Sequence, residues 1–256
     1  MPREAAQEDR GLVVFGRRAV IEALRAERTV NRLWVDESTP AAAFAAVFEA
    51  ANARGIHVER VPRAKLEAQA GPHHQGVVAL CAPIAYVDIE TLLARAASRG
   101  EPALLLLLDG VQDPQNIGSL IRTAEVAGAH GIVLPERRAG AVTPAVVRAA
   151  AGAALVLPVA RVKNLGQAAL RLQEAGVQVV VAHPAAQQLV YGADLTGPTA
   201  IVVGGEGQGV SDLMRRRADR VVALPQAGSI GSLNAAVAGA VMVYEAVRQR
   251  AAKARP

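Results

Sequence analysis

The sequence of 256 residues predicts an α/β protein with two modules, a small one followed by a larger one that contains a mostly parallel sheet. Two observations predict this class. Apolar runs of strand length alternate with amphipathic segments of helix length, as in βαβ units. In the second half the apolar runs, such as LLLLLDG at 104–110, are continuous rather than alternating, which is typical of strands covered by helices on both faces.

The first module alternates helix and strand signals over about 80 residues. Gly55 ends one helical pattern, Pro62 precedes the next, and Pro83 ends a strand pattern. We expect helices at 16–27, 41–55 and 62–70, and strands at 32–38, 57–61 and 75–83. The segment 84–102 has a helical middle and a Gly100–Pro102 break. The predicted organisation is therefore an amino-terminal domain at 1–84, a linker at 85–101 and a second domain at 102–256.

The second module repeats the alternation with stronger strand signals. Strands are predicted at 104–110, 131–135, 177–184, 199–205 and 220–226. Helices are predicted at 116–128, 143–152, 164–176, 211–220 and 232–250.

Composition limits the class of protein. With 52% hydrophobic and 20% charged residues, the chain has the balance of a globular protein rather than a disordered one. The sequence has no run of about 20 apolar residues, and MPREAAQEDR has no apolar signal region, so we expect a cytoplasmic protein that does not enter a membrane. A single cysteine, Cys81, excludes an internal disulfide.

The net charge of +5 is a weak indication of a polyanionic partner. Two basic runs, RRRADR at 215–220 and RQRAAKARP at 248–256, could contact phosphate. A solvated helix face is the commoner explanation of such runs.

Three predicted strands end in turns with unusual residues. These are DGVQDPQNIG at 109–118, GGEGQGVS at 204–211 and LPQAGSIGSLN at 224–234. Ligands in α/β proteins bind at the carboxyl ends of strands, so polar residues in such turns are candidates for a site. The glycines of the second turn fit neither the dinucleotide-binding spacing nor a phosphate-binding Walker loop, but they allow close approach of the backbone to a ligand.

Each turn contributes candidate side chains. Asn116 and Arg122 lie on the polar face of the helix that follows the first turn; a surface pair of Arg122 with Glu125 is the alternative for the arginine. Glu206 is the one carboxylate of the second turn and could equally be a solvent-exposed turn residue. In the third turn we expect Ser232 to be the N-cap and Asn234 to fall in the first helical turn, where asparagine is unfavourable without a function.

Together, DPQNIGSLIRTAEVAG, VVGGEGQGVS and LPQAGSIGSLNAAVA resemble the three ordered motifs of the SpoU/TrmH family of RNA ribose 2′-O-methyltransferases. VFGRRAVIEAL and HHQGVVAL resemble the amino-terminal RNA-binding domain of the RlmB-type branch, which modifies a guanosine in the P-site loop of 23S ribosomal RNA. The resemblance covers nearly the whole chain. It departs at Ala235 and Ala236, where the third motif commonly continues Val-Ser.

The resemblance implies a small α/β RNA-binding domain and a SPOUT methyltransferase domain with a carboxyl-terminal trefoil knot, which the general rarity of knots would argue against. It implies S-adenosylmethionine as cofactor and a homodimer with the active site near the interface. The functional residues it carries over are Asn116, Arg122, Glu206, Ser232 and Asn234. The cofactor-binding residues are Gly204, Gly205, Glu206, Gly207, Leu224, Pro225, Ile230, Ser232 and Leu233.

The chemistry of methyl transfer needs alignment and a more nucleophilic hydroxyl, and no metal. The histidines show no ligand spacing, so no metal site is predicted. Arg122 could grip a phosphate beside the target ribose and stabilise developing alkoxide charge. A guanidinium rarely gives up its proton, so we do not expect Arg122 to be the general base. Glu206 could accept the proton or could orient Arg122, and the sequence leaves both functions open.

The expected partner is 23S ribosomal RNA or a ribosomal precursor, contacted in the first domain by Arg17, Arg18, His73 and His74, although the two histidines could instead belong to a structural loop. With 3% aromatic residues, stacking on aromatic platforms is not the expected mode of RNA binding. The alternatives are a tRNA or another 23S site as substrate, and a non-catalytic RNA-binding assembly factor. A nucleotide-dependent oxidoreductase fails on the glycine spacing.

Overall fold

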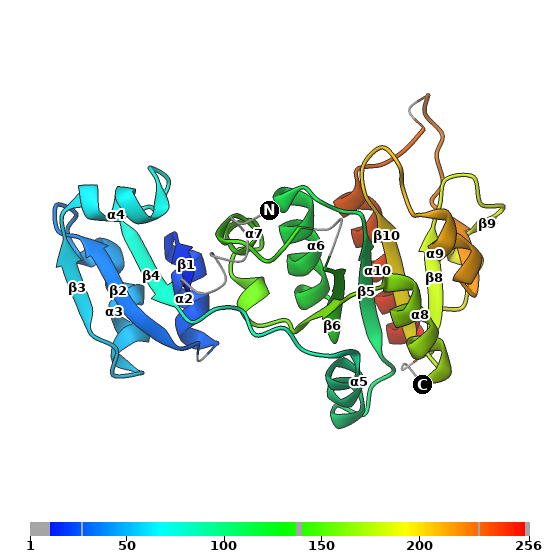
Figure 1. Ribbon diagram of the computed structural model, residues 1–256, viewed down its shortest axis with the longest axis horizontal. Helices are drawn as coiled ribbons and strands as arrows, with labels where there is room; N and C mark the ends of the chain where they lie inside the picture. Colours follow the sequence, from blue (N-terminus) through cyan, green and yellow to red (C-terminus); the bar gives the residue numbers. More distant parts are fainter. Residues whose placement is uncertain (1–10, 27, 137–139, 230, 254–256) are drawn as a thin grey trace. The chain divides into compact units, whose positions relative to one another are not determined.

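The computed structural model describes residues 11–26, 28–136, 140–229 and 231–253. Contacts divide the chain into two compact units (Figure 1). Unit 1 comprises the described residues of Met1–Ala85 together with Val142–Val156, and unit 2 those of Tyr86–Ala141 and Leu157–Pro256. All described residues of the expected first domain, 1–84, lie in unit 1, and a segment from the second half of the sequence joins it.

Unit 1 is built on a sheet of four strands in the order β1-β4-β2-β3. Strand β4 runs antiparallel to β1 and β2, and β2 runs parallel to β3, so β1, β2 and β3 all end at the same edge. The strands are β1 (Leu12–Phe15), β2 (Val30–Asp36), β3 (Val58–Val61) and β4 (Val77–Cys81). The helices are α2 (Arg17–Arg25), a 3-10 turn (Ala41–Phe44) continued by α3 (Ala45–Asn52), and α4 (Arg63–Ala70).

The segment of unit 1 that comes from the second half contains α7 (Pro144–Ala149) and a 3-10 turn at Ala153–Leu155. Thr143 caps α7 by accepting a hydrogen bond from the backbone of Val146. The guanidinium of Arg148 lies 5.5 Å from the ring centroid of Phe15, within cation–π range. A Cβ on Gly152 would lie 2.6 Å from that of Glu22, so this turn packs directly on α2. The contacts of Arg148 and Gly152 thus join residues that are more than a hundred positions apart in the chain.

Unit 2 is a seven-stranded sheet in the order β7-β6-β5-β10-β8-β11-β9, with every recorded strand pair parallel. Its strands are β5 (Leu104–Asp109), β6 (Gly131–Pro135), β7 (Val159–Val162), β8 (Gln178–Ala182), β9 (Gln188–Leu189), β10 (Thr199–Gly204) and β11 (Arg220–Ala223). The order reverses direction beside β5, since β6 and β7 extend to one side and β10 lies on the other. Such a reversal opens a ligand site at the carboxyl ends of the central strands.

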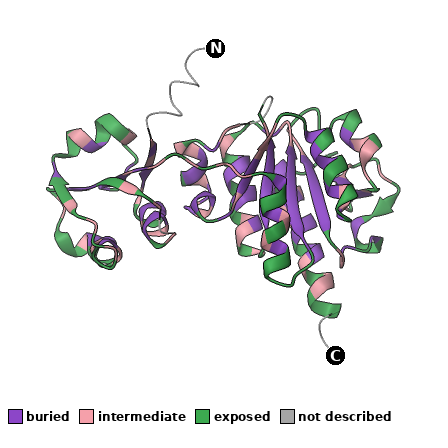
Figure 2. Ribbon diagram, turned by 60° about the horizontal axis from the view of Figure 1, so that its bottom comes forward, coloured by how far each residue is buried: buried purple, intermediate pink, exposed green. Residues whose placement is uncertain are grey.

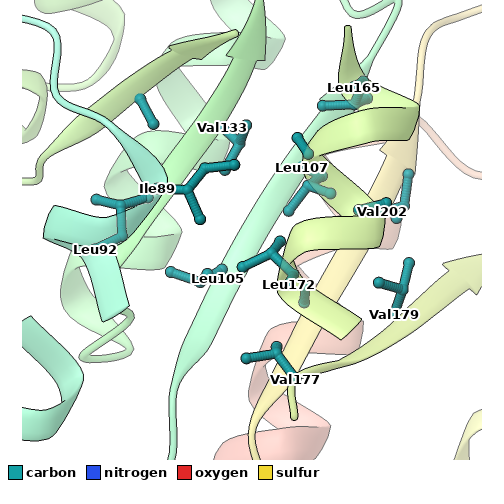
Figure 3. Packing of buried hydrophobic residues seen from close by; sticks show 14 of the residues in the cluster. Ile89, Leu92, Leu105, Leu107, Val133, Leu165, Leu172, Val177, Val179 and Val202 are labelled. Carbon is teal, nitrogen blue, oxygen red and sulfur yellow. The ribbon is translucent and has the colours of Figure 1, made fainter. Parts of the chain in front are cut away.

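Helices cover both faces of this sheet. They are α5 (Ile89–Ser98), α6 (Pro114–Val126), α8 (Leu165–Glu174), a short 3-10 turn (Val190–Gly192), α9 (Asp212–Arg217) and α10 (Ala235–Lys253). Leu105 and Leu107 of β5 pack with α5 and α8 on one face (Figure 3). The alternate residues of the central strands meet α6 and α10, since a Cβ on Gly239 would touch Leu120 and Val203. The strands are therefore buried from both sides (Figure 2).

The predicted α/β class with a small module and a mostly parallel second sheet is confirmed. All five leucines of β5 are buried, as the continuous apolar run predicted. Residues 85–101, expected to be a linker, contain α5, whose Ile89, Leu92 and Ala96 belong to the core of unit 2. Strands β1, β7 and β9 have no counterpart among the predicted elements.

Arg250 of α10 fixes the last helix to the opposite end of the sheet from the turns described below. Its guanidinium donates hydrogen bonds to the backbone carbonyls of Pro102, Ala103, Leu195 and Gly197. In the part of the chain that the structure describes, no helix is long and apolar enough to cross a membrane.

Candidate active site

The turns after β5 and β10 are joined to each other through their backbones. The two strands are neighbours, and Gly204 pairs with Asp109 in register. The backbone N–H of Gly205 donates to the carbonyl of Asp109 over 2.9 Å, and the N–H of Ser211 donates to the Asp109 carboxylate over 2.7 Å. Asp109 therefore holds both ends of the glycine-rich turn, a function that sequence reasoning did not assign to it.

Two glycines of the second turn have no room for a side chain. A Cβ on Gly205 would lie 2.1 Å from the carbonyl oxygen of Gly110, and one on Gly204 would lie 2.1 Å from the carbonyl carbon of Gly209. Both positions meet backbone atoms, which cannot swing aside as a side chain could. The close approach of the two turns thus requires glycine at these positions.

Asn116 is fixed at the start of α6. Asp113 caps the helix by accepting hydrogen bonds from the N–H groups of Gln115 and Asn116, and Pro114 occupies the first helical position. The side chain of Asn116 is buried, with 6% of the residue exposed. Its Nδ2 donates to Oε1 of Glu206 over 2.8 Å, which links the first turn to the second.

Asn234 links the third turn to the other two. It caps α10, because its Oδ1 accepts hydrogen bonds from the N–H groups of Ala236 and Val237. Its Nδ2 donates to Oδ1 of Asn116 over 2.9 Å and to Oε1 of Glu206 over 3.0 Å. The prediction that Ser232 caps this helix was wrong: the helix begins at Ala235, so the residue directly before it is Asn234.

Asn116, Glu206 and Asn234 thus form a closed triangle of side-chain hydrogen bonds, which we call the amide–carboxylate triad. Oε1 of Glu206 accepts from both asparagines, whereas Oε2 makes no hydrogen bond within the described residues. Glu206 itself is exposed. The arrangement holds one carboxylate oxygen and leaves the other as an acceptor for a hydroxyl group.

A cavity of about 540 Å³ lies beside the triad. Of the predicted cofactor-binding residues, Gly204, Gly205, Glu206, Gly207, Leu224, Ser232 and Leu233 line it. Pro225 does not line it, and Ile230 lies outside the described residues. The lining also includes His183 and Pro184, which follow β8, and Gln226 after β11. Sequence reasoning missed these, although VQVVVAHP also ends a predicted strand in a polar residue and a proline.

Arg122 takes no part in the hydrogen bonds of the triad. It is exposed, does not line the cavity and makes no hydrogen bond or ion pair with any described residue. The surface ion pair between Arg122 and Glu125, which the sequence offered as the alternative, therefore does not form among the described residues. Arg122 lies four residues before Val126, so the two share one face of α6.

The residues predicted to contact RNA lie in three different settings. Arg17 and His73 line a cavity within unit 1, and Arg18 is exposed on α2 without lining it. His74 is fully buried, and its Nδ1 accepts a hydrogen bond from the backbone of Gly76, so this ring is part of the turn's structure. Among the described residues there is no cluster of three or more histidine, cysteine or acidic side chains arranged to hold a metal.

Comparison with known proteins agrees with this geometry. The profile of the SpoU rRNA Methylase family matches residues 103–244, and that of the RNA 2′-O ribose methyltransferase substrate-binding domain matches residues 13–87. A relative from Bacillus subtilis (strain 168), described as putative TrmH family tRNA/rRNA methyltransferase YacO, is 40% identical over 237 residues, which is 93% of this chain and 95% of its own.

Two further relatives cover nearly the whole chain. The 23S rRNA (guanosine-2′-O-)-methyltransferase RlmB of Pseudomonas syringae pv. tomato is 39% identical over 245 residues, 95% of this chain and 98% of its own. The crystal structure of the SpoU methyltransferase AviRb from Streptomyces viridochromogenes, in complex with the cofactor AdoMet, has a TM-score of 0.81 and 30% identity, and covers 98% of this chain and 94% of that one. Since a family profile matches more than half of the chain and carries all three turns, the chain belongs to the SpoU rRNA methylase family and is an RNA ribose 2′-O-methyltransferase.

Proposed function

We propose that this enzyme methylates the ribose 2′-hydroxyl of a guanosine in 23S ribosomal RNA, in the P-site loop, with S-adenosylmethionine as methyl donor. The observation that carries the proposal is the amide–carboxylate triad beside the cavity. It brings together side chains from all three motifs. The similarity to the RlmB protein of Pseudomonas syringae supports the choice of RNA. The reaction takes place in the cytoplasm, where ribosomal RNA is made and assembled.

The cavity fits the methyl donor. Its volume of about 540 Å³ falls in the range of small-molecule sites, roughly 300–1,000 Å³. Val203, Val210, Leu224 and Ala238 supply apolar walls, and the backbones of 204–210, Leu224 and Gln226 can supply hydrogen-bond donors and acceptors. When bound, S-adenosylmethionine supplies a methyl group on a positively charged sulfur. The trefoil knot expected from the family resemblance stays a prediction and involves these same carboxyl-terminal segments.

The triad's function is to present one carboxylate oxygen to the ribose. The amides of Asn116 and Asn234 hold Oε1 of Glu206, and Oε2 is left to accept the hydrogen bond of the 2′-hydroxyl. When the hydroxyl takes the methyl group, the methyl–sulfur bond of the donor would break with its electron pair staying on sulfur. Glu206 would accept the hydroxyl proton at Oε2 and release it to solvent. A positioned carboxylate of this kind contributes roughly 10²–10⁴-fold to a rate. We assign the proton to Glu206 rather than Arg122, because a guanidinium keeps its proton at neutral pH.

Arg122 acts on the RNA phosphate next to the target ribose, and we propose that it does so in a homodimer. Val126 shares its face of α6 and is 65% exposed. On the neighbouring helix α10, Val237 and Tyr244 are 49% and 47% exposed. A second copy of the chain covering these apolar residues would enclose Arg122 in the interface. The arginine would then serve the triad of the other copy, which agrees with its lack of partners among the described residues of its own chain.

Unit 1 supplies the remaining RNA contacts in this proposal. Its match to a substrate-binding family and the presence of Arg17 and His73 on one cavity support that role. Phosphate contacts from such a domain fix the position of the RNA, while its shape decides which ribose reaches the triad.

The choice of substrate is tested with radiolabelled S-adenosylmethionine on unmodified 23S RNA and on bulk tRNA. After alkaline hydrolysis, the label should remain in a cleavage-resistant dinucleotide from 23S RNA, since a 2′-O-methyl group blocks cleavage. Label in tRNA alone would support ribose 2′-O-methylation but would show that tRNA, rather than 23S RNA, is the substrate. If neither RNA is labelled but a ribosomal precursor is, the substrate is an assembly intermediate; cofactor binding without any transfer would leave the assembly-factor alternative.

A further inference from the structure

Unit 1 contains a cavity of about 420 Å³ at the edge where β1, β2 and β3 all end. Its lining includes Arg17, which follows β1; Asp36 and Thr39, at and after the end of β2; and Arg63, which follows β3. His73 and Gln75 close it from the turn before β4. The cavity thus occupies the same position in this small sheet that ligand sites occupy in larger α/β sheets.

Two arginines supply the cationic groups on the lining of the cavity. Arg17 is exposed, and its guanidinium lies 5.2 Å from the ring centroid of the buried Phe44, which holds the side chain over the sheet edge. The side chain of Arg63 is 58% exposed and pairs with Glu67 over 2.9 Å. Arg63 also lies 4.0 Å from the carboxylate of Asp36, at the limit of an ion pair. Arg63 therefore faces two carboxylates, but more than half of its side chain is exposed, so an anion can still reach the guanidinium.

Asp36 fixes one wall of the cavity. Its carboxylate is 2% exposed and accepts hydrogen bonds from the N–H and hydroxyl of Ser38 and from the hydroxyl of Thr39. The Ser38 hydroxyl lowers the pKa of Asp36, and burial opposes that effect. The carboxylate is thus occupied by its own turn, and it holds Thr39 in place on the cavity wall.

The opposite wall is held in an unusual backbone conformation. Gln75 has φ 53°, a left-handed value rarely adopted by a residue with a side chain, and its Oε1 accepts a hydrogen bond from the backbone N–H of Arg17 over 3.1 Å. Gly76 has no room for a side chain, since a Cβ there would lie 2.8 Å from the ring of Phe44. Strained backbone of this kind persists where the surroundings fix it, and it concentrates at ligand sites.

We infer that this cavity binds one nucleotide of the RNA substrate away from the methylated ribose, with its phosphate between Arg17 and Arg63. Thr39, His73 and Gln75 are the polar groups within reach of the sugar or base. The volume falls within the range of roughly 300–1,000 Å³ that holds small-molecule ligands, and the lining is mainly polar, as a phosphate-bearing ligand requires. Both arginines are exposed to solvent, so a nucleotide can enter with the chain continuing on each side. The inference rests on the proposed function, because the same RNA must reach the triad.

The experiment uses the full-length enzyme with Arg17→Ala, Arg63→Gln and the double substitution. The matched control is Arg25→Ala, at the other end of α2, where the side chain is 69% exposed and pairs with Glu22. KM for RNA, kcat, the salt dependence of RNA binding and the affinity for S-adenosylmethionine are measured for each. Each single substitution should raise KM about tenfold and lower the salt slope by about one released counterion, with kcat and cofactor affinity unchanged.

Equal KM values in the cavity variants and in Arg25→Ala would overturn the inference. Binding of guanosine monophosphate or inorganic phosphate in the cavity, without competition against RNA, would also overturn it and assign the site to a free ligand. Circular dichroism identifies a variant that fails to fold; for such a variant, Thr39→Val tests the same wall without removing a charge. If the wild type transfers no methyl group to any RNA, the proposed function fails, and direct RNA binding still tests the cavity separately.

Discussion

Asn116 and Glu206 lie 90 positions apart in the chain, yet Nδ2 of the first donates to Oε1 of the second over 2.8 Å. Asn234 joins both, so the triad is a closed unit rather than a set of independent contacts. Members of such a unit lose function together, because the remaining two cannot hold the geometry alone.

Removing any one member of the triad should therefore lower the rate of methyl transfer almost as much as removing all three. We expect Asn116→Ala and Glu206→Ala each to lower kcat by roughly 10²–10³-fold, and the double substitution to add little. The control is Asn164→Ala, which removes the N-cap of α8 and should cost about 1 kcal/mol of stability without changing kcat. Single-turnover methyl transfer measures the rates. Additive losses in the double variant would contradict the triad as a unit.

Gly205→Ala should disrupt the contact between the first and second turns. The new Cβ would meet the carbonyl of Gly110 at 2.1 Å, so one backbone segment must move and the cavity wall with it. We expect the affinity for S-adenosylmethionine, measured by calorimetry, to fall by more than about tenfold, or 1.4 kcal/mol.

Gly228→Ala is the matched control for that change. Gly228 lies in the third turn, has no atom within 4 Å of an added Cβ and is not among the glycines with positive φ. Its substitution should leave cofactor affinity unaltered. Equal affinities of the two variants would show that the close approach at Gly205 does not shape the cofactor site.

A mixed dimer tests whether Arg122 serves the triad of the other copy. Arg122→Ala and Glu206→Ala should each be inactive as pure samples. Mixing them with subunit exchange gives dimers in which one site combines an intact Glu206 with an intact Arg122, so activity should return to about a quarter of wild type. Recovery near zero, with exchange verified by tagged subunits, would place both residues in one chain. A monomer in sedimentation would exclude the shared site altogether.

His130 should make stability depend on pH. It is buried, its Nδ1 accepts a hydrogen bond from the backbone of Leu104, and burial lowers its pKa below the ordinary 6.5, an effect that Glu101 opposes. Because the pKa of His130 is lower in the folded chain than in the unfolded chain, the unfolded chain binds a proton on this ring more readily below pH 6.5. Its stabilising contribution is complete above pH 6.5 and is lost as pH falls from 6.5 towards the folded-state pKa, with a slope of at most about 1.4 kcal/mol per pH unit.

Urea unfolding between pH 8 and pH 5 measures that slope. His130→Gln should flatten the dependence relative to wild type, while Glu101→Gln, which removes the carboxylate that raises the pKa, should extend the loss to lower pH. An unchanged slope in His130→Gln would show that this ring titrates alike in the folded and unfolded chain.

Much of the fold could be predicted because local patterns and packing agree. The run of leucines in β5 indicated a strand buried on both faces, and the alternation of strands and helices indicated a parallel sheet. Strands β1, β7 and β9 are only two to four residues long, so they carry too little pattern to be found without their neighbours. That α7 packs on β1 in unit 1 depends on contacts such as Arg148 with Phe15, which no local signal encodes.

The identity of the site residues could be predicted from the motifs, but the function of each residue depends on geometry and was harder to predict. Asn116, Glu206 and Asn234 were candidates from their positions after strands, and the structure brings them together. The capping role belongs to Asn234 rather than Ser232, because the start of a helix is set by which side chain reaches the free N–H groups. Arg63 gave no signal in the sequence: only the folded sheet edge brings it to the same cavity as Arg17.

The most direct test of the account compares methyl transfer to unmodified 23S RNA by the wild type, Arg122→Ala and Glu125→Ala. Glu125 lies three residues from Arg122 on the same helix and is the control for a change at the surface of α6. We expect the wild type and Glu125→Ala to place label in an alkali-resistant dinucleotide, and Arg122→Ala to lose at least about 10²-fold in rate while still binding S-adenosylmethionine. Undiminished transfer by Arg122→Ala, or no transfer by the wild type to any RNA, would contradict it.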